Sequence, residues 1–197
     1  MNRAIDKSVV INFFNSICDE YDSHNHQNVE TIHTILSYAD VTNKDVLDIA
    51  CGPGVLFDMY HNMNIKSLAA IDISEKMIEK CKSKFPNYCI NYYCMDAEEM
   101  SFENTYDSIV LFNAFPHIAH PEVLVQKVYT ALRNNGTFTI AHGSSREIID
   151  NCHSKLPDNL SRKLWELSKF TDLLSTHFDI ETAIDNNQMI IIVGRKK

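Results

Sequence analysis

Apolar and polar positions along the chain change their period near residue 40. Before that point, apolar residues recur every three or four positions, which predicts two amphipathic helices between about 8 and 38. Beyond it, short apolar runs alternate with helical patterns. The runs expected to form strands are 45–50, 67–72, 88–95, 106–112, 137–142, 178–184 and 189–194. The segments expected to form helices are 55–63, 75–85, 121–132 and parts of 144–175.

This order of elements predicts an α/β fold. Strands separated by helical crossovers form a parallel sheet with helices on both of its faces. Only Asp185-Asn186-Asn187 separates the last two strand segments, which predicts a closing hairpin with an antiparallel strand. The 197 residues contain no repeat or low-complexity tract and have the length of one α/β domain. We therefore expect a single domain over 1–197 with a seven-stranded, mostly parallel sheet.

The first strand segment ends in a glycine-containing loop, Ala50-Cys51-Gly52-Pro53-Gly54, which leads into a helix. Glycines there let the backbone approach a ligand closely. Asp48 precedes the loop and Asp72 ends the next apolar run, a pair that suits a ligand with an amine and a ribose. The dinucleotide fingerprint G-x-G-x-x-G fails at Phe57, and no Walker-type Gly-Lys-Ser or Gly-Lys-Thr follows. The alternative is a tight turn in a purely structural domain.

The segment from Val46 to Gly54 resembles the first motif of class I S-adenosylmethionine-dependent methyltransferases. That motif reads acid, apolar, small, Cys or Gly, Gly, Thr or Pro, Gly. The resemblance covers residues from about 40 to 142 through motifs and the rest through the order of elements. It implies a Rossmann-like sheet, S-adenosyl-L-methionine as the cofactor, and a place in the small-molecule branch that includes the ubiquinone and menaquinone methyltransferases.

The resemblance also implies which residues hold the cofactor. Asp48 and the glycine loop would face the methionine moiety, and Asp72 would accept both ribose hydroxyls. Ile73 and Met77 would pack on the adenine, whose amine would donate to Asp96. The alternative for Asp96 is a cap on the turn after the third strand. The full set of expected cofactor-binding residues is Asp48, Ala50, Cys51, Gly52, Gly54, Asp72, Ile73, Met77, Asp96, Ala97 and Asn113.

Candidate catalytic residues follow from the chemistry of this cofactor. Its sulfonium already activates the methyl group, so alignment of the acceptor and exclusion of water supply most of the barrier reduction. A hydroxyl, thiol or carbon-acid acceptor also needs a general base, a task that suits histidine. His117 follows the fourth strand and His142 ends the fifth, at the sheet edge where open α/β folds bind ligands. For each histidine the alternative is a surface or capping residue without a chemical role.

The acceptor is expected to be a small molecule. Ala114-Phe115 stands where enzymes that methylate exocyclic or amide nitrogen carry Pro-Pro and an aromatic residue, which disfavours adenine-N6 and glutamine. Metal-assisted transfer at the histidines is one alternative, but they lack tight ligand spacing, so we expect no metal. Another alternative is a noncatalytic S-adenosylmethionine-binding sensor or partner subunit.

The segment 13–22 resembles the lid of quinone-type C-methyltransferases. The resemblance implies that 1–40 forms a helical lid over a cofactor-binding core at 41–142, with 143–197 as helical cover and closing hairpin. Tyr21 would lie near the sulfonium or carboxylate and is the third candidate catalytic residue. Phe13, Phe14 and Trp165 are expected to help close an apolar pocket, although helical spacing also makes the two phenylalanines ordinary packing residues.

Composition limits the partners and the compartment. A formal charge of −8 and a pI near 5.5 disfavour nucleic acid and acidic membranes as partners. No apolar run approaches the roughly 20 residues that span a bilayer, and the N-terminus lacks a secretory pattern. The six cysteines form no C-x-x-C pair and are expected to be reduced. We therefore expect a cytoplasmic monomer or homodimer.

Overall fold

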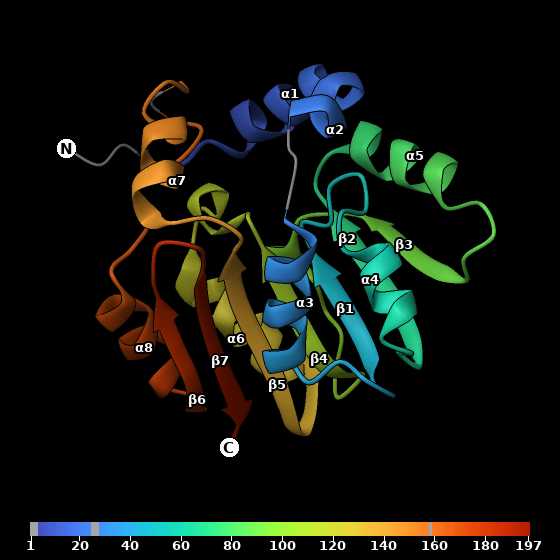
Figure 1. Cartoon of the computed structure of the whole chain (residues 1–197), viewed down its shortest axis with the longest axis vertical. Coiled ribbons are helices and arrows are strands. Elements are labelled where there is room, and N and C mark those ends of the chain that lie inside the picture. Colours follow the sequence, from blue (N-terminus) through green and yellow to red (C-terminus); the bar gives the residue numbers. More distant parts are fainter. Residues whose placement is uncertain (1–3, 25–27, 158) are drawn as a thin grey trace.

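The computed structural model describes residues 4–24, 28–157 and 159–197, and its strands form one seven-stranded sheet of order β3-β2-β1-β4-β5-β7-β6 (Figure 1). The five strands from β3 to β5 are parallel, and β7 runs antiparallel to both β5 and β6. This confirms the predicted parallel sheet with a closing hairpin. The strands are β1 Asp45–Ile49, β2 Ser67–Asp72, β3 Ile90–Cys94, β4 Tyr106–Phe112, β5 Leu132–His142, β6 Phe178–Asp185 and β7 Ile190–Lys196.

The helices fall close to the segments that periodicity predicts. Those of eight or more residues are α1 Lys7–Ile17, α3 Val29–Tyr38, α5 Glu75–Lys84, α6 Pro121–Ala131, α7 Arg146–His153 and α8 Leu167–Ser175. The shorter ones are α2 Tyr21–His24 and α4 Phe57–Asn62, together with the 3₁₀ turns η1 Cys18–Glu20, η2 Ala97–Glu99 and η3 Phe115–His117. Ser74 caps α5, because its hydroxyl accepts the Met77 amide at 3.2 Å.

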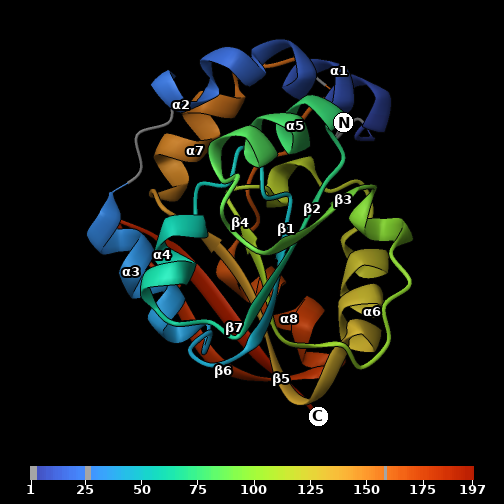
Figure 2. The same cartoon turned by 90° about the vertical axis from the view of Figure 1, so that its right-hand side faces the viewer.

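Two apolar layers enclose the sheet. On one face α3, α4 and α5 contribute buried residues such as Leu36, Phe57 and Ile78. On the other face α6 and α8 contribute residues such as Val128 and Phe170. Figure 2 shows α3 and α4 on one side of the sheet and α6 on the other. Burial of both faces explains why β4 is apolar almost throughout.

The helices α1 and α2 lie across the carboxyl edge of the parallel strands (Figure 1). Ile5 and Val10 form a small buried cluster with Leu160, against which Phe14 and Ile73 pack. The covering segment thus has its own apolar contacts, separate from the two layers of the sheet. The expected helical lid over 1–40 stays a prediction, and α3 within that range packs in a layer of the sheet instead.

The start of β5 differs from the prediction. We expected a helix to 132 and a turn at 134–136, but β5 begins at Leu132 directly after α6. Leu132 pairs with Tyr106 and Thr137 pairs with Ser108, so the strand contains an irregularity at this point. Asn135 takes a φ of 61° within it. The Asn-Asn-Gly sequence therefore forms a bulge in the strand and not a separating turn.

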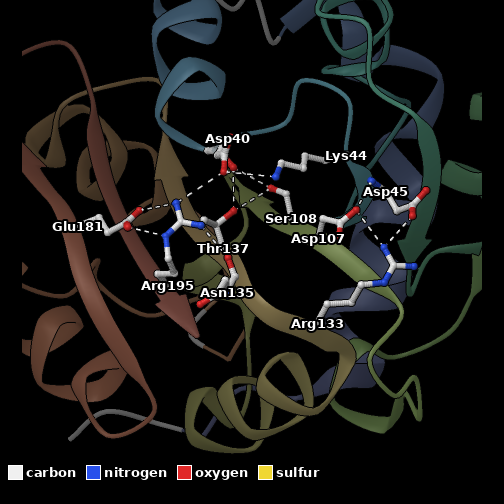
Figure 3. Close-up of polar contacts among 11 residues, drawn as sticks. Asp40, Lys44, Asp45, Asp107, Ser108, Arg133, Asn135, Thr137, Glu181 and Arg195 are labelled. Carbon is white, nitrogen blue, oxygen red and sulfur yellow. Dashed lines mark hydrogen bonds and ion pairs between the residues drawn. The ribbon is translucent and has the colours of Figure 1, made fainter. Parts of the chain in front are cut away.

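Polar contacts lock the opposite, amino edge of the sheet (Figure 3). Arg133 on the bulge of β5 contacts Asp45 at 2.7 Å and Asp107 at 2.9 Å. The hydroxyls of Ser108 and Thr137 donate to the carbonyl oxygen of Ala39, at 2.8 and 2.9 Å. These contacts join the end of α3 to three neighbouring strands. The rigid end of the fold thus lies away from the edge that the lid covers.

Candidate active site

A cleft of about 780 Å³, open mouth included, lies beneath α1 at the carboxyl ends of β1, β2 and β4. The loop after β1, the segment after β3 and the lid complete its walls. The cleft brings together most of the predicted cofactor-binding residues. Those that line it are Ala50, Gly52, Asp72, Ile73, Met77, Asp96, Ala97 and Asn113.

A second hollow of about 350 Å³ adjoins the first and is lined by two further predicted residues, Asp48 and Cys51. Tyr21, Gly52 and Asn113 are among the residues that line both hollows. The two spaces therefore meet around the glycine loop, beneath the tyrosine of the lid. One ligand that follows the loop would touch both Asp48 and Asp72.

The two glycines of the loop have different roles. Gly52 has a φ of +54°, and no atom lies within 4 Å of the place where a Cβ would stand, so the loop leaves open space beside it. Gly54 has a φ of +84°, and a Cβ there would lie 2.6 Å from Phe85 and 2.9 Å from Cys81. It lines neither hollow. Gly54 therefore lets the loop pack on α5, which corrects the expectation that it faces the ligand.

Asp72 connects the end of β2 with the glycine loop. One carboxylate oxygen accepts the Gly52 amide and the other accepts the Ser74 amide, both at 2.8 Å. Burial raises the pKa of Asp72 to about 6, although these backbone hydrogen bonds act in the opposite direction. Each carboxylate oxygen has two acceptor positions, so both can also accept a hydroxyl from a ligand in the cleft.

Asp48 is buried at 2% exposure, and its Oδ2 atom has no hydrogen-bond partner in the structure. Burial and the neighbouring charge of Asp72 raise its pKa well above the usual value. A buried polar atom without a partner is rare in a folded protein. Its position in the wall of the second hollow suits a cationic or hydrogen-bond-donating group such as an amine.

Asp96 lines the cleft and also has the structural role considered for it, while its contact with adenine stays a prediction. Its Oδ1 atom accepts the Glu98 amide at 2.8 Å and so caps η2, as in the structural alternative. Its other oxygen forms an ion pair with Lys7 of α1, and the Lys7 ammonium also contacts Glu98 at 2.7 Å. Burial acts to raise the pKa of Glu98, yet hydrogen bonds from Lys7 and His120 hold it below its usual value.

Sequence reasoning missed Lys7 and Glu98 as residues of the cleft. A single lysine at the start of an amphipathic helix carries no signal of a buried partner. Glu98 lies in the motif that contains Asp96, but the sequence gives no reason to separate it from its exposed neighbour Glu99.

His117 lines the cleft in η3, as predicted. Its Nδ1 atom lies 3.0 Å from the carbonyl oxygen of Leu160, and its ring packs edge-on against Phe14 with centroids 5.0 Å apart. Because a carbonyl oxygen only accepts, Nδ1 carries the proton and Nε2 keeps a lone pair. Burial lowers the pKa of His117 to about 4, so the ring is neutral near pH 7.

His142 has a different environment. It is buried at 2% exposure, its Nε2 atom has no hydrogen-bond partner in the structure, and burial lowers its pKa to about 3. It belongs to the lining of neither hollow. The Asn113 side chain accepts the Gly143 amide at 3.0 Å and so holds the ends of β4 and β5 together in front of it. The expectation of direct contact with an acceptor is therefore kept for His117 alone.

Tyr21 of the lid reaches both hollows. Burial, followed by the charge of Asp72, raises its pKa to about 12, so it stays a neutral hydroxyl. Phe14 lines the cleft, but Phe13 does not, and Trp165 packs on Phe115 with ring centroids 5.0 Å apart. The expected closing role of Phe13 and Trp165 is therefore wrong, because both belong to neighbouring packing.

Within 4–24, 28–157 and 159–197, no group of three or more His, Cys, Asp or Glu side chains is placed to hold a metal ion. Over the same residues, no helix is both long enough and apolar enough to cross a membrane.

Comparisons with known proteins were made for the sequence and for the fold. Residues 46–136 match the family model described as a methyltransferase domain. A malonyl-[acyl-carrier protein] O-methyltransferase of Anoxybacillus flavithermus is 27% identical over 129 residues, which are 65% of this chain and 50% of that protein. This chain therefore spans about half the length of that curated relative.

Solved structures share the fold at low sequence identity. A putative S-adenosylmethionine-dependent methyltransferase from Listeria monocytogenes has a TM-score of 0.67 at 19% identity, covering 86% of this chain and all of that one. A structure of a methyltransferase activator in complex with a putative methyltransferase from Haloferax volcanii has a TM-score of 0.82 at 14% identity, covering 95% and 97%.

Proposed function

Since the chain belongs to the class I S-adenosylmethionine-dependent methyltransferases, we propose that it transfers the methyl group of S-adenosylmethionine to a small-molecule acceptor in the cleft. The observation that carries this proposal is the placement of Asp48 and Asp72 on the two sides of Gly52, in adjoining hollows. Two buried carboxylates with raised pKa values suit a ligand that brings a positive charge and several hydrogen-bond donors.

The residues of the two hollows fit the cofactor. Asp72 would accept the ribose hydroxyls, Asp48 would take the amine through its unpartnered oxygen, and Asp96 with Ala97 would hold the adenine edge beside Ile73 and Met77. The open space beside Gly52 leaves room for the chain of the cofactor. When bound, S-adenosylmethionine supplies an electrophilic methyl group on a sulfonium.

His117 is proposed to face the acceptor. Its Nε2 lone pair can accept a hydrogen bond, and then a proton, from the nucleophile, while Leu160 fixes the ring. Tyr21 is proposed to lie over the reacting centre as a neutral hydroxyl that excludes water. His142 would act on this site only indirectly, from its buried position at the end of β5.

Residues 4–24, which contain α1 and α2, are proposed to act as the lid, whereas α3 packs in a layer of the sheet and belongs with the core at 41–142. Polar contacts at the surface join the lid to α5 and its N-cap: Asn15 accepts the Ser74 hydroxyl at 2.6 Å, and Lys80 donates to the carbonyl of Cys18 at 2.5 Å. Six free thiols support the cytoplasmic location expected from the sequence. The acidic balance supports an acceptor that is not nucleic acid.

Binding and turnover must be tested separately. Calorimetry with S-adenosylhomocysteine measures the site, and transfer of labelled methyl from S-adenosylmethionine to a panel of phenol, thiol, amine and carbon-acid acceptors measures catalysis. We expect binding at one site and turnover of at least one acceptor. Binding without turnover of any acceptor would favour the noncatalytic sensor or partner subunit. Absence of binding would contradict the proposal.

A further inference from the structure

We propose that the methyl acceptor is a neutral hydroxyl or thiol carried on an apolar body, and not a carboxylate. This inference rests on the proposed function and names the substrate class of the same site. It starts from the acceptor end of the cleft, defined as the space between α1 and the segment after β4. The acceptor end is lined by Val10, Phe14, His117, Ile118 and Ala119.

The acceptor end is apolar apart from one imidazole. Val10, Phe14 and Ala119 belong to the apolar cluster beneath the lid, and the Phe14 ring packs edge-on against His117. An acceptor body that fills this space must therefore lose its water without gaining polar partners. Aromatic or aliphatic carbon tolerates that exchange, whereas an ionised group does not.

The charges of the cleft lining are mostly negative. The lining contains three carboxylates, those of Asp72, Asp96 and Glu98, and one ammonium, that of Lys7. Lys7 forms ion pairs with both Asp96 and Glu98, so its charge is already compensated within the wall. A carboxylate on the acceptor would add a further negative charge, and none of these lining side chains offers it a free cation.

The arginines near the acceptor end do not supply that cation. The Arg162 guanidinium donates to the carbonyl oxygens of Ile118 at 2.5 Å and Ala119 at 2.8 Å, from behind the wall. The Arg146 guanidinium donates to the carbonyl oxygens of Leu164 and Trp165. Neither arginine belongs to the lining of the cleft. A bidentate carboxylate site, which arginine typically provides, is not formed by these residues.

A hydroxyl or thiol acceptor carries a proton that the Nε2 atom of His117 can accept. The acceptor oxygen or sulfur forms its bond to the methyl carbon while its proton passes to Nε2 of His117, and the electron pair of the broken carbon–sulfur bond stays on the sulfur of the cofactor. The resulting imidazolium returns its proton to water after the product leaves. A carboxylate acceptor would bring no proton, and the neutral imidazole held by Leu160 would have nothing to accept.

The acceptor proposed for this chain differs from the substrate that the name of the Anoxybacillus flavithermus relative gives. The relative is named as an O-methyltransferase of a malonyl group, and a malonyl group attached to a carrier protein keeps one carboxylate. The lining side chains of the cleft leave no free cation for that carboxylate, so this chain should not accept a malonyl thioester.

Matched pairs of probes test the proposal in protein loaded with S-adenosylhomocysteine. The pairs are 2-naphthol with 2-naphthoate, hexanol with hexanoate, and hexane-1-thiol with the same hexanoate, each titrated by calorimetry at pH 7. We expect the neutral member of a pair to bind at least about tenfold more tightly than the carboxylate. Equal or tighter binding of the carboxylates, absence of binding by every neutral member, or methylation of a malonyl thioester would overturn the proposal.

A pair of variants tests the electrostatic cause. Glu98→Gln leaves Lys7 with one carboxylate partner and should raise the affinity for 2-naphthoate by several-fold. Glu99→Gln removes the same charge from the exposed neighbouring position, without contact to Lys7, and should leave that affinity unchanged. Equal responses of the two variants would overturn the explanation. If the unmodified protein does not bind S-adenosylhomocysteine, that result would instead contradict the proposed function itself.

Discussion

The Asp72 carboxylate accepts a hydrogen bond from the backbone amide of Gly52 at 2.8 Å, across the space between the ends of β2 and β1. This contact holds the glycine loop in its left-handed turn and keeps an ionisable group buried at 7% exposure. The geometry of the loop and the pH dependence of cofactor affinity therefore both depend on the Asp72 carboxylate.

The first prediction is that cofactor affinity rises with pH through about 6. Ribose hydroxyls donate to the ionised form of Asp72, whose pKa in the free protein is about 6, so binding favours loss of its proton. Between pH 5 and 7, calorimetry should show tightening by at most about tenfold per pH unit, with proton release to the buffer. In the Asp72→Asn variant the part of both effects that is centred near pH 6 should vanish. A pH-independent affinity in the unmodified protein would exclude Asp72 as the titrating group.

The sequence predicts the sheet and its order of elements well, because periodicity and turn residues act locally. The Asp185-Asn186-Asn187 turn is an example: the Asn186 side chain accepts the amides of Gln188 and Met189, as an asparagine does in a hairpin. Local propensity failed at Asn135, where pairing of β5 with β4 overrides the turn signal of Asn-Asn-Gly.

A position at or near a strand end identifies several of the predicted residues that line the two hollows. Asp48, Asp72 and Asp96 lie at or near the ends of parallel strands, and all three reach a hollow. His142 also ends a strand, but its side chain turns into the core, and one sequence does not reveal which way a terminal residue faces. Sequence patterns could not identify Lys7 as a site residue either, because its partners Asp96 and Glu98 lie about 90 residues away along the chain.

The second prediction concerns His117. Replacement by alanine should lower turnover by roughly 100-fold to 10,000-fold with little change in S-adenosylhomocysteine affinity, which is the pattern of a general base. At saturating cofactor, activity of the unmodified protein should fall only as pH drops through about 4, since the base must be neutral. His33→Ala, on the exposed surface of α3, is the matched control. Full activity of the His117→Ala variant would leave catalysis to alignment alone.

The third prediction concerns the lid. Hydrogen exchange of residues 7–24 should slow when S-adenosylhomocysteine binds, because a closed cover protects its own amides. Asn15→Ala removes the acceptor of the Ser74 hydroxyl and should speed exchange and weaken binding by about threefold to tenfold. Asn12→Ala, which alters an exposed position of α1, should do neither. Identical exchange with and without ligand would make the N-terminal helices part of the static core.

The fourth prediction concerns the amino edge of the sheet. Hydrogen bonds from Lys66, Ser67 and Arg133 hold the pKa of Asp45 well below its usual range. A depressed pKa gives stability that is present above the unfolded value near 4 and is lost as pH falls below it. Asp45→Asn should therefore lower the free energy of unfolding by about 1–3 kcal/mol at pH 7. Urea unfolding at pH 7 and pH 3 should show this difference shrinking in acid.

Asp179→Asn serves as the control for that experiment, because Asp179 is exposed and its nearest ion pair, with Lys197, is 3.9 Å long. Its effect on the unfolding free energy should be small at both pH values. A stability difference for Asp45→Asn that stays constant between pH 7 and pH 3 would show that the ionised carboxylate is not what stabilises this edge.

The most direct test of the account is a calorimetric titration of S-adenosylhomocysteine into the unmodified protein and the Asp72→Ala variant at pH 7.5. The account predicts one site in the unmodified protein, competition by S-adenosylmethionine, and at least about 100-fold weaker binding in the variant, since two charge-assisted hydrogen bonds are lost. Circular dichroism should show both proteins folded. Binding that is absent from the unmodified protein, or undiminished in a folded Asp72→Ala variant, would contradict the account.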